Sequence, residues 1–400
     1  MSEEPKNGAE GSKKPNPLKE LTQPFVDLVH APRALWGINL PYLLEGMCYF
    51  GVLGYLAIYF SDVVFAGVEH ADVWSHRMVM IQTAGITIAM FFLGFVADKF
   101  GVRFALLAAF IVMLCGRVLI AAGPALGFQP GLGASLQFAT VAGILLVVVG
   151  YGMYQPAAYA GVRKFTNPRT ASMAFAMLYA LMNLGGYLPT YAFLVREDKF
   201  LGWGLNGAFW VYSGFTFLSL VVTFFILSPR TVKAAIEKAK EEAEAAAEGQ
   251  KTGESKQAVG VGAGRRFAPF HLWLIVAGLM ALGYFTNQGP VAAIVVGCFA
   301  VVWVALTLVP VTGRWLARHP LSDAKFAFFI FALIPVQTLF TYNWLILPQY
   351  VSRCYEGWIG EKFEIASNFN PLLIFIAVPI ITALSYKRKV YNMMIVGTFI

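Results

Sequence analysis

The run FALLAAFIVMLCGRVLIAA, residues 104–122, decides the fold class. It has the length of about 20 apolar residues that a helix needs to cross a bilayer, and its single charged residue is Arg117. The whole chain has the same character: hydrophobic residues make up 58% of it, charged residues 13%, and the mean hydropathy is +0.64. One water-soluble core cannot bury so much apolar surface, whereas a helix in lipid satisfies its own backbone hydrogen bonds. The sequence therefore predicts an all-α polytopic membrane protein.

Similar apolar runs recur along the chain, with short polar loops between them. We expect spans at residues 35–60, 78–97, 104–122, 136–159, 171–195 and 207–227, then at 269–285, 291–311, 326–347 and 371–386. A tight turn at 287–290 joins the seventh and eighth spans into a hairpin. Between the sixth and seventh spans, residues 228–266 begin as an Ala/Glu/Lys-rich surface helix and continue as a Gly-rich stretch.

These runs predict five regions. They are a disordered cytoplasmic tail (1–31), an N-terminal six-helix bundle (32–228), a cytoplasmic linker (229–266), an extra transmembrane hairpin (267–319) and the start of a C-terminal bundle (320–400). A last apolar run begins near Val390, and we expect the sequence to be truncated inside that helix.

Lysines and arginines gather in the loops on one side of the expected spans, and acidic residues gather on the other. This distribution predicts that the N-terminus lies in the cytoplasm. The expected location is the plasma membrane or the bacterial inner membrane. The same distribution also explains the net charge of +8 without nucleic acid, which we do not expect as a partner. The expected partners are the lipid bilayer and a small-molecule or short-peptide substrate, with protons as an option, and the expected state is a monomer. The acidic loop residues are Asp62, Glu69, Asp72, Glu197, Asp198, Glu356 and Glu361.

The cysteines and histidines carry no pattern of a metal site or an enzyme. Cys48, Cys115, Cys298 and Cys354 are scattered. The five histidines lie at loops or helix ends, and no two have ligand spacing. GxSxG, HExxH and P-loop motifs are absent from the sequence. We therefore expect no metal, no cofactor and no enzymatic activity.

Two charges fall inside expected spans. Glu45 lies near the middle of the first span, where a carboxylate costs about 2.5–3.5 kcal/mol on insertion scales. We expect it to face a water-filled cavity or to be protonated, and to be the proton-carrying residue if transport is coupled to protons. Arg117 lies nearer the outer end of the third span, so it can either reach the membrane surface or pair with Glu45.

Polar and aromatic residues form stripes on four of the expected helices. Such stripes suit a cavity that hydrogen-bonds a polar solute and stacks on its apolar parts. The alternative is that the tyrosines pack between helices or lie at the membrane interface. The stripes are Tyr42, Glu45 and Tyr49; Tyr151, Gln155 and Tyr159; Tyr179, Asn183 and Tyr187; and Gln337, Thr341 and Trp344.

The loop after the second span reads GFVADKFGVR, residues 94–103. Its glycines permit a sharp turn, and its acid and bases can pair at helix ends. This loop resembles the loop motif of the major facilitator superfamily. The resemblance implies a major facilitator fold and a cytoplasmic gate made by Gly94, Asp98, Lys99, Gly101 and Arg103.

Three further segments resemble the proton-dependent oligopeptide transporter (POT) family. They are EGMCYFG at 45–51, FAMLYALMNLGG at 175–186 and NPLLIFIAVP at 370–379. The extra hairpin is similar to one in bacterial members. The resemblance implies secondary transport by alternating access, with Asn183 and Asn370 at positions that contact substrate.

Charged positions of that family are replaced here by neutral residues. They fall at Tyr42, Gly46, Leu53, Gln155 and Val336, so the network that senses protons and grips peptide termini is expected to be largely neutralised. Two alternatives to a proton-coupled transporter of a peptide-like or other small polar solute therefore stay open. One is an uncoupled facilitator of a non-peptide solute, and the other is a sensor derived from a transporter that no longer moves its ligand.

Overall fold

The structure is a computed structural model that describes residues 32–167, 170–248, 269–287, 289–385 and 393. Its regular elements in these ranges are helices. The chain divides into two compact units, a larger one from residues 1–251 with 341–400 and a smaller one from residues 252–340. The expected helical fold is confirmed, and the helices are long and apolar enough to cross a membrane in seven places, or eight if a bent pair counts as one span.

The six spans expected before residue 228 are confirmed as helices of the larger unit. Each helix extends beyond at least one end of the apolar run that predicted it. Hydropathy marks the lipid-crossing part of a helix and not its last hydrogen-bonded turn. The helices are α2 (Arg33–Tyr59) with the π-helix η1 (Phe60–Val64), α3 (Ala71–Leu93) with α4 (Phe95–Phe100), α5 (Val102–Ala125), α6 (Ser135–Phe165), α7 (Ala171–Tyr187) with η2 (Leu188–Tyr191) and α8 (Phe193–Arg196), and α9 (Gly204–Ile226).

Glycines set the closest helix contacts of this bundle. A Cβ atom added to Gly185 on α7 would lie 2.1 Å from the carbonyl oxygen of Leu43 on α2, and one added to Gly46 would lie 2.5 Å from that of Met182. Gly116 on α5 and Gly143 on α6 meet in the same way, each with the other's carbonyl oxygen. Small residues let membrane helices approach this closely and gain dispersion contacts that lipid does not offer.

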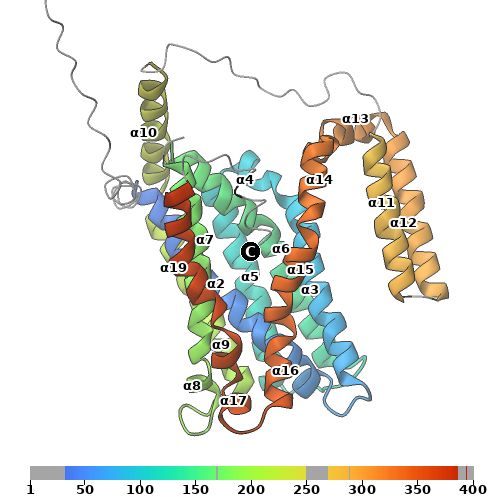
Figure 1. Ribbon diagram of the computed structural model, residues 1–400. Helices are drawn as coiled ribbons and strands as arrows, with labels where there is room; N and C mark the ends of the chain where they lie inside the picture. Colours follow the sequence, from blue (N-terminus) through green and yellow to red (C-terminus); the bar gives the residue numbers. More distant parts are fainter. Residues whose placement is uncertain (1–31, 168–169, 249–268, 288, 386–392, 394–400) are drawn as a thin grey trace, which may run out of the picture. The chain divides into compact units, whose positions relative to one another are not determined.

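The chain changes direction at each turn of the bundle, so its loops gather at two ends (Figure 1). We call the end with residues 94–103 and 163–167 the basic end. The end with residues 61–70, 126–134 and 197–203 is the acidic end. Helix α10 (Pro229–Glu248) follows the bundle at the basic end as the expected charged surface helix, and Asn167 Nδ2 donates a hydrogen bond to its Glu242 at 2.6 Å.

The rest of the larger unit is a segment that returns to the bundle from far along the sequence. After Thr341 it contains α16 (Leu347–Cys354), α17 (Gly357–Glu361), α18 (Phe363–Ser367) and α19 (Asn370–Ser385). Helix α19 confirms the span expected at 371–386 and packs against α7 (Figure 1). We call residues 341–385 the C-terminal segment.

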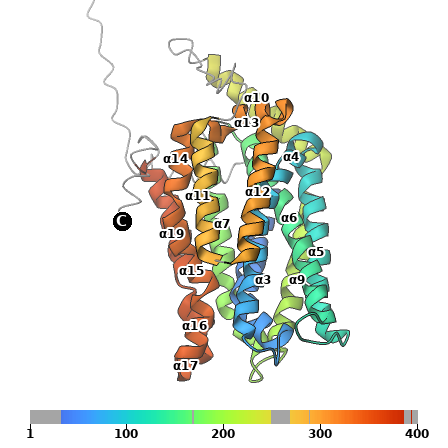
Figure 2. The same ribbon diagram turned by 90° about the vertical axis from the view of Figure 1, so that its right-hand side faces the viewer.

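The smaller unit contains the hairpin. Its helices are α11 (Phe270–Asn287) and α12 (Pro290–Leu308), which form the expected pair, then α13 (Pro310–Arg318), η3 (Pro320–Ser322) and α14 (Ala324–Ala332); Figure 2 shows α11 beside α12. Helices α12 and α13 meet at 90°, because Pro310 has no N–H to continue the helical hydrogen bonds. Leu272 and Leu316 are the buried centre of this unit.

The span expected at 326–347 contains a helix break that the sequence analysis did not predict. The chain forms α14, breaks at Leu333 and starts again as α15 (Ile334–Leu345). Pro335 lies at the start of the second helix, where a missing N–H is tolerated, whereas it would disrupt the interior of one long helix.

Candidate functional site

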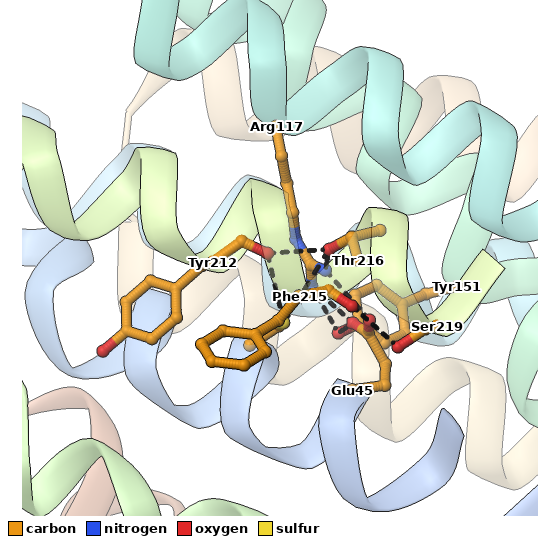
Figure 3. A network of polar contacts seen from close by, with 8 residues as sticks. Glu45, Arg117, Tyr151, Tyr212, Phe215, Thr216 and Ser219 are labelled. Atoms are coloured by element: carbon orange, nitrogen blue, oxygen red, sulfur yellow. Dashed lines mark hydrogen bonds and ion pairs between the residues drawn. The ribbon is translucent and has the colours of Figure 1, made fainter. Parts of the chain in front are cut away.

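A buried ion pair lies at mid-height in the helix bundle. Glu45 on α2 is 0% exposed and Arg117 on α5 is 3% exposed. Arg117 Nη1 donates to Glu45 Oε2 at 2.9 Å, and Nη2 donates to Oε1, so the contact is bidentate (Figure 3). Two parallel charge-assisted hydrogen bonds are the strongest arrangement that these two side chains can form.

Two further helices supply groups to this pair. The Tyr151 hydroxyl on α6 donates to Glu45 Oε1 and accepts from Arg117 Nη2 at 2.9 Å. Thr216 on α9 accepts from Arg117 Nη1, and its hydroxyl lies 3.0 Å from the Tyr212 carbonyl oxygen, to which it donates. Four helices, α2, α5, α6 and α9, therefore meet in one network, and the two opposite charges compensate each other inside it.

The position of Glu45 corrects the sequence-based prediction. We expected a carboxylate that faces a water-filled cavity or is protonated, but Glu45 is enclosed by protein and both of its oxygens accept hydrogen bonds from Arg117. Of the alternatives for Arg117, pairing with Glu45 is confirmed. A buried charge is tolerable only when it has a partner and hydrogen bonds, so Arg117 on another helix removes the need for water at Glu45. The expected neutralisation of the charged network is correspondingly incomplete.

The predicted stripes on α2 and α6 meet each other beside this network. The Tyr42 hydroxyl donates to Gln155 Oε1 at 2.7 Å. The Tyr42 ring also stacks on Tyr154 with centroids 5.6 Å apart, and Tyr49 meets the edge of Tyr151 at 5.2 Å. Tyr42 and Tyr151 are buried, so in this conformation both tyrosines pack between helices, which was the alternative interpretation of the stripes.

The other predicted site residues lie on separate elements. Asn183 on α7 is buried, and its Nδ2 donates to the Tyr179 carbonyl oxygen at 2.9 Å. The Trp344 ring is in tilted contact with Phe50, with 4.1 Å between centroids. Asn370 is the first residue of α19 and is partly buried. The side chain of Gln337 lies outside the described residues.

The glycine-rich loop at the basic end has the turn that its sequence predicts. Gly101 adopts φ +89°, a left-handed region that glycine enters without steric cost. Gly94 is helical, and a Cβ atom there would lie 3.1 Å from the Met90 carbonyl oxygen. Asp98 lies 3.8 Å from Lys164 at the end of α6. Arg103 lies over the Phe224 ring of α9, 5.4 Å from its centroid.

Lys99 lies over Phe100, its neighbour in sequence, at 5.3 Å from the ring centroid. The predicted gate residues thus contact side chains of α6 and α9 and the loop itself.

A second carboxylate–guanidinium contact lies at the acidic end and joins the bundle to the C-terminal segment. Glu364 on α18 is 6% exposed. Its Oε1 accepts from the Tyr55 hydroxyl of α2 at 2.7 Å and from Arg196 Nε of α8 at 3.0 Å. Beside it, Lys362 Nζ lies 3.1 Å from Glu197 Oε2.

More polar contacts extend this joint. Arg353 on α16 donates to Asp72 at 2.6 Å, and this hydrogen bond raises the pKa of the Arg353 guanidinium. Asn368 Nδ2 donates to the Gly186 carbonyl oxygen at 2.8 Å and to the Thr190 hydroxyl at 2.9 Å. We call this set of contacts the acidic-end joint.

The sequence analysis missed Arg196, Glu364 and Asn368. Each lies just outside a span expected from the sequence, although the helical spans of the structure extend to include it, so nothing in its local pattern separates it from an ordinary loop residue. The available signal is that Glu364 and Lys362 lie in one short loop opposite Arg196 and Glu197 in another. Two loops on the same side of a membrane that each carry an acid and a base can pair with each other and are candidates for contact.

Comparison with known proteins gives a likeness of structure only. No family model and no curated protein matches the sequence. Among solved structures, a peptide transporter POT in complex with sulfate is 18% identical, with a TM-score of 0.52 over 89% of this chain and 69% of the other. The POT family transporter PepTSo is also 18% identical, with a TM-score of 0.53 over 90% of this chain and 71% of the other.

A third similar structure is a POT family transporter in complex with 5-aminolevulinic acid. It is 17% identical, with a TM-score of 0.51 over 90% of this chain and 71% of the other. The chain therefore has the fold of these transporters, and the resemblance drawn from the segments at 45–51, 175–186 and 370–379 is confirmed at the level of the fold. An integral, multi-pass membrane protein follows from that fold and from the apolar helices.

Proposed function

We propose that this protein is a secondary transporter that moves a small polar solute, peptide-like or other, across a membrane by alternating access. The observation that carries the proposal is the acidic-end joint. Residues between 165 and 281 positions apart in the sequence meet there through ion pairs and amide hydrogen bonds. Such contacts can exchange for contacts with water at low cost, whereas an apolar contact of the same extent cannot. The likeness to POT transporters supports the same function.

In this proposal the acidic-end joint is the outer gate. The distribution of lysine and arginine supports a cytoplasmic N-terminus and basic end, and in this proposal the acidic end faces outward. Opening the gate requires Glu364 to leave Arg196 and Tyr55. The loop at 94–103 is the inner counterpart, where Asp98 contacts Lys164 across the ends of two helices. One gate opens while the other stays closed, as alternating access requires.

The solute path runs between α2, α6, α7 and the C-terminal segment. Tyr42, Tyr49 and Gln155 offer hydroxyl and amide groups, and Asn183 and Asn370 lie on the helices that face each other, α7 and α19. Trp344 completes the proposed path on the part of α15 that belongs to the C-terminal segment. Because Arg117 and Glu45 are bound to each other, neither is available to grip a peptide terminus. This pairing favours neutral or amine-bearing solutes over peptides that require two fixed charges.

A second candidate is an uncoupled facilitator. The observation that favours it is that both Glu45 oxygens are occupied by Arg117 and Tyr151. A carboxylate that must carry a proton needs access to water at some stage, and Glu45 is enclosed by four helices. In this candidate Glu45 stabilises the bundle, and the solute moves down its own gradient.

Gate locking tests the proposal. The protein carrying Asp72→Cys, Arg353→Cys and Cys354→Ser is reconstituted in liposomes, and counterflow of dialanine and of 5-aminolevulinic acid is measured before and after treatment with a short, reducible bifunctional thiol reagent. We expect flux to fall at least tenfold on cross-linking and to return on reduction. The single variant Asp72→Cys, with Cys354→Ser, controls for simple thiol modification. Undiminished flux through the cross-linked protein contradicts alternating access at this gate.

The same liposomes separate the two candidates. Flux with an imposed pH gradient is compared with flux after an ionophore removes that gradient. A transporter coupled to protons loses concentrative uptake when the gradient is removed, and an uncoupled facilitator shows the same counterflow in both conditions.

A further inference from the structure

A small cavity lies next to the acidic-end joint, inside the larger unit. Helices α2 and α9 form one side of it through Gly54 and Tyr212, and the C-terminal segment forms the other through Trp344, Glu364 and Asn368. Its free volume is about 30 Å³, and one water needs roughly 10–15 Å³ on this measure. The cavity can therefore hold about two waters or one small polar head group.

Two of the unsatisfied atoms at this cavity can only accept hydrogen bonds. Glu364 Oε2 is buried without a hydrogen-bond partner among the described residues, because Tyr55 and Arg196 both bind Oε1. Asn368 Oδ1 is also buried and without a partner there, since its Nδ2 is held by Gly186 and Thr190. Those two donations fix the orientation of the amide, so its oxygen stays open. A buried acceptor without a donor is costly, and a ligand with several N–H donors removes that cost.

Aromatic rings surround the same space. The rings of Phe50 and Trp344 are in tilted contact with centroids 4.1 Å apart, and Tyr55 meets Phe363 edge-on at 6.0 Å. All four line the cavity. Aromatic faces attract a cation that is close to them and partly desolvated. A carboxylate oxygen, an amide oxygen and aromatic walls together match the chemistry of an organic ammonium group.

The charge of Glu364 determines which kind of cation the cavity favours. Arg196 compensates part of that charge from the Oε1 side, which lowers the attraction for a bare inorganic ion. A primary ammonium has three N–H donors, which matches the open acceptors, and it carries an apolar stem that can lie against the rings.

We propose that this cavity binds the primary ammonium group of a small organic amine. Its role as an outer recognition site depends on the proposed transport function, but binding itself does not. Tyr212, whose buried hydroxyl has no hydrogen-bond partner among the described residues, supplies a third polar contact. The remainder of the amine extends from the cavity toward the joint.

Thermal unfolding of the purified full chain in detergent tests this site without any transport step. The probe is ethylammonium chloride, and the controls are ethanol and NaCl at the same concentrations. We expect the unfolding midpoint to rise in a saturable way with ethylammonium and to stay unchanged with ethanol and with NaCl. Glu364→Gln is expected to weaken the apparent affinity at least tenfold, the equivalent of about 1.4 kcal/mol. Glu361→Gln changes an exposed carboxylate on the adjacent helix α17 and is expected to respond like the unchanged protein.

A second variant keeps the test decisive if Glu364→Gln fails to fold. A Cβ atom added to Gly54 meets no atom within 4 Å, so Gly54→Leu fills the cavity and leaves the contact between Glu364 and Arg196 intact. Replacing a glycine inside a helix is also favourable for the helix itself. We expect this variant to fold at least as stably and to lose the response to ethylammonium.

Three results overturn the proposal. They are an equal response to ethanol, which indicates an apolar site; an equal response to NaCl, which indicates an inorganic cation or an ionic-strength effect; and an unchanged ethylammonium response in Gly54→Leu, which places the binding elsewhere. A protein that binds ethylammonium but shows no counterflow would refute the transport function and leave this site intact.

Discussion

The larger unit contains two versions of one arrangement, a glutamate bound by a tyrosine and an arginine. In the bundle, Glu45 accepts from Tyr151 and Arg117. At the acidic end, Glu364 accepts from Tyr55 and Arg196. The two arrangements differ in how many carboxylate oxygens accept a hydrogen bond. Both oxygens of Glu45 are occupied, whereas Glu364 leaves Oε2 open beside a cavity.

The two arrangements also differ in what they join. The Glu45 pair ties helices of one compact bundle, and Arg117 is 3% exposed. The Glu364 pair ties the bundle to the C-terminal segment, and the Arg196 side chain is 23% exposed. The same pair of side chains can therefore hold the helix bundle together permanently at Glu45 and open reversibly at Glu364. Each prediction below measures one consequence of that difference.

The largest effect is expected from removing the charge of Glu45. Glu45→Gln leaves the Arg117 guanidinium buried without a counter-charge, which costs about 3–5 kcal/mol of unfolding free energy. Chemical denaturation in detergent, followed by circular dichroism, measures the loss. The double variant Glu45→Gln with Arg117→Met removes both charges and is expected to regain most of the stability. A single variant that loses less than about 1 kcal/mol contradicts the buried ion pair.

A smaller effect is expected from removing one hydroxyl in each arrangement. Tyr151→Phe takes one hydrogen bond from a buried carboxylate, a loss of about 1.5–3 kcal/mol in unfolding free energy. Tyr55→Phe is the matched change at the joint, and we expect it to act locally. Backbone hydrogen exchange should become faster in α16–α18 and stay unchanged in α5 and α6. Global destabilisation by Tyr55→Phe equal to that of Tyr151→Phe would remove the distinction between the two sites.

The smallest effect is expected at the exposed edge of the joint. Arg353 and Asp72 form an ion pair whose side chains are 44% and 50% exposed, and pairs of this kind contribute about 0–1 kcal/mol and are screened by salt. Arg353→Gln should therefore change the unfolding midpoint little at low salt and not at all at 1 M salt, where the Debye length is about 3 Å. A large effect that persists in high salt would show that this pair is desolvated, like the one at Glu45.

Much of the fold could be predicted from the sequence because the length of an apolar run is a local property. Residues 104–122 predict a helix without reference to any other part of the chain, and α5 contains them all. The break at Leu333 was missed for the same reason. Pro335 lies inside an apolar run, and hydropathy does not register the N–H that proline lacks.

The site was less predictable because its contacts join distant residues. The cost of a carboxylate at position 45 is visible in the sequence, and it correctly marked Glu45 as a residue that needs compensation. The compensating residue, Arg117, lies 72 positions away on another helix. Whether water or Arg117 compensates the carboxylate depends on how α2 and α5 face each other. Glu364 was missed because a loop acid carries no such cost until a second loop covers it.

The glycine contacts between α2 and α7 bear on how such a protein can change over evolutionary time. Most lipid-facing positions can exchange one apolar residue for another, and the polar residues of the path can be replaced to suit a new solute. Gly46 and Gly185 have no such freedom, because the main chain of the opposite helix occupies the place of a side chain. Descendants of this protein that evolve to carry a different solute would keep glycine at these two positions, while nearly all the residues around the solute change.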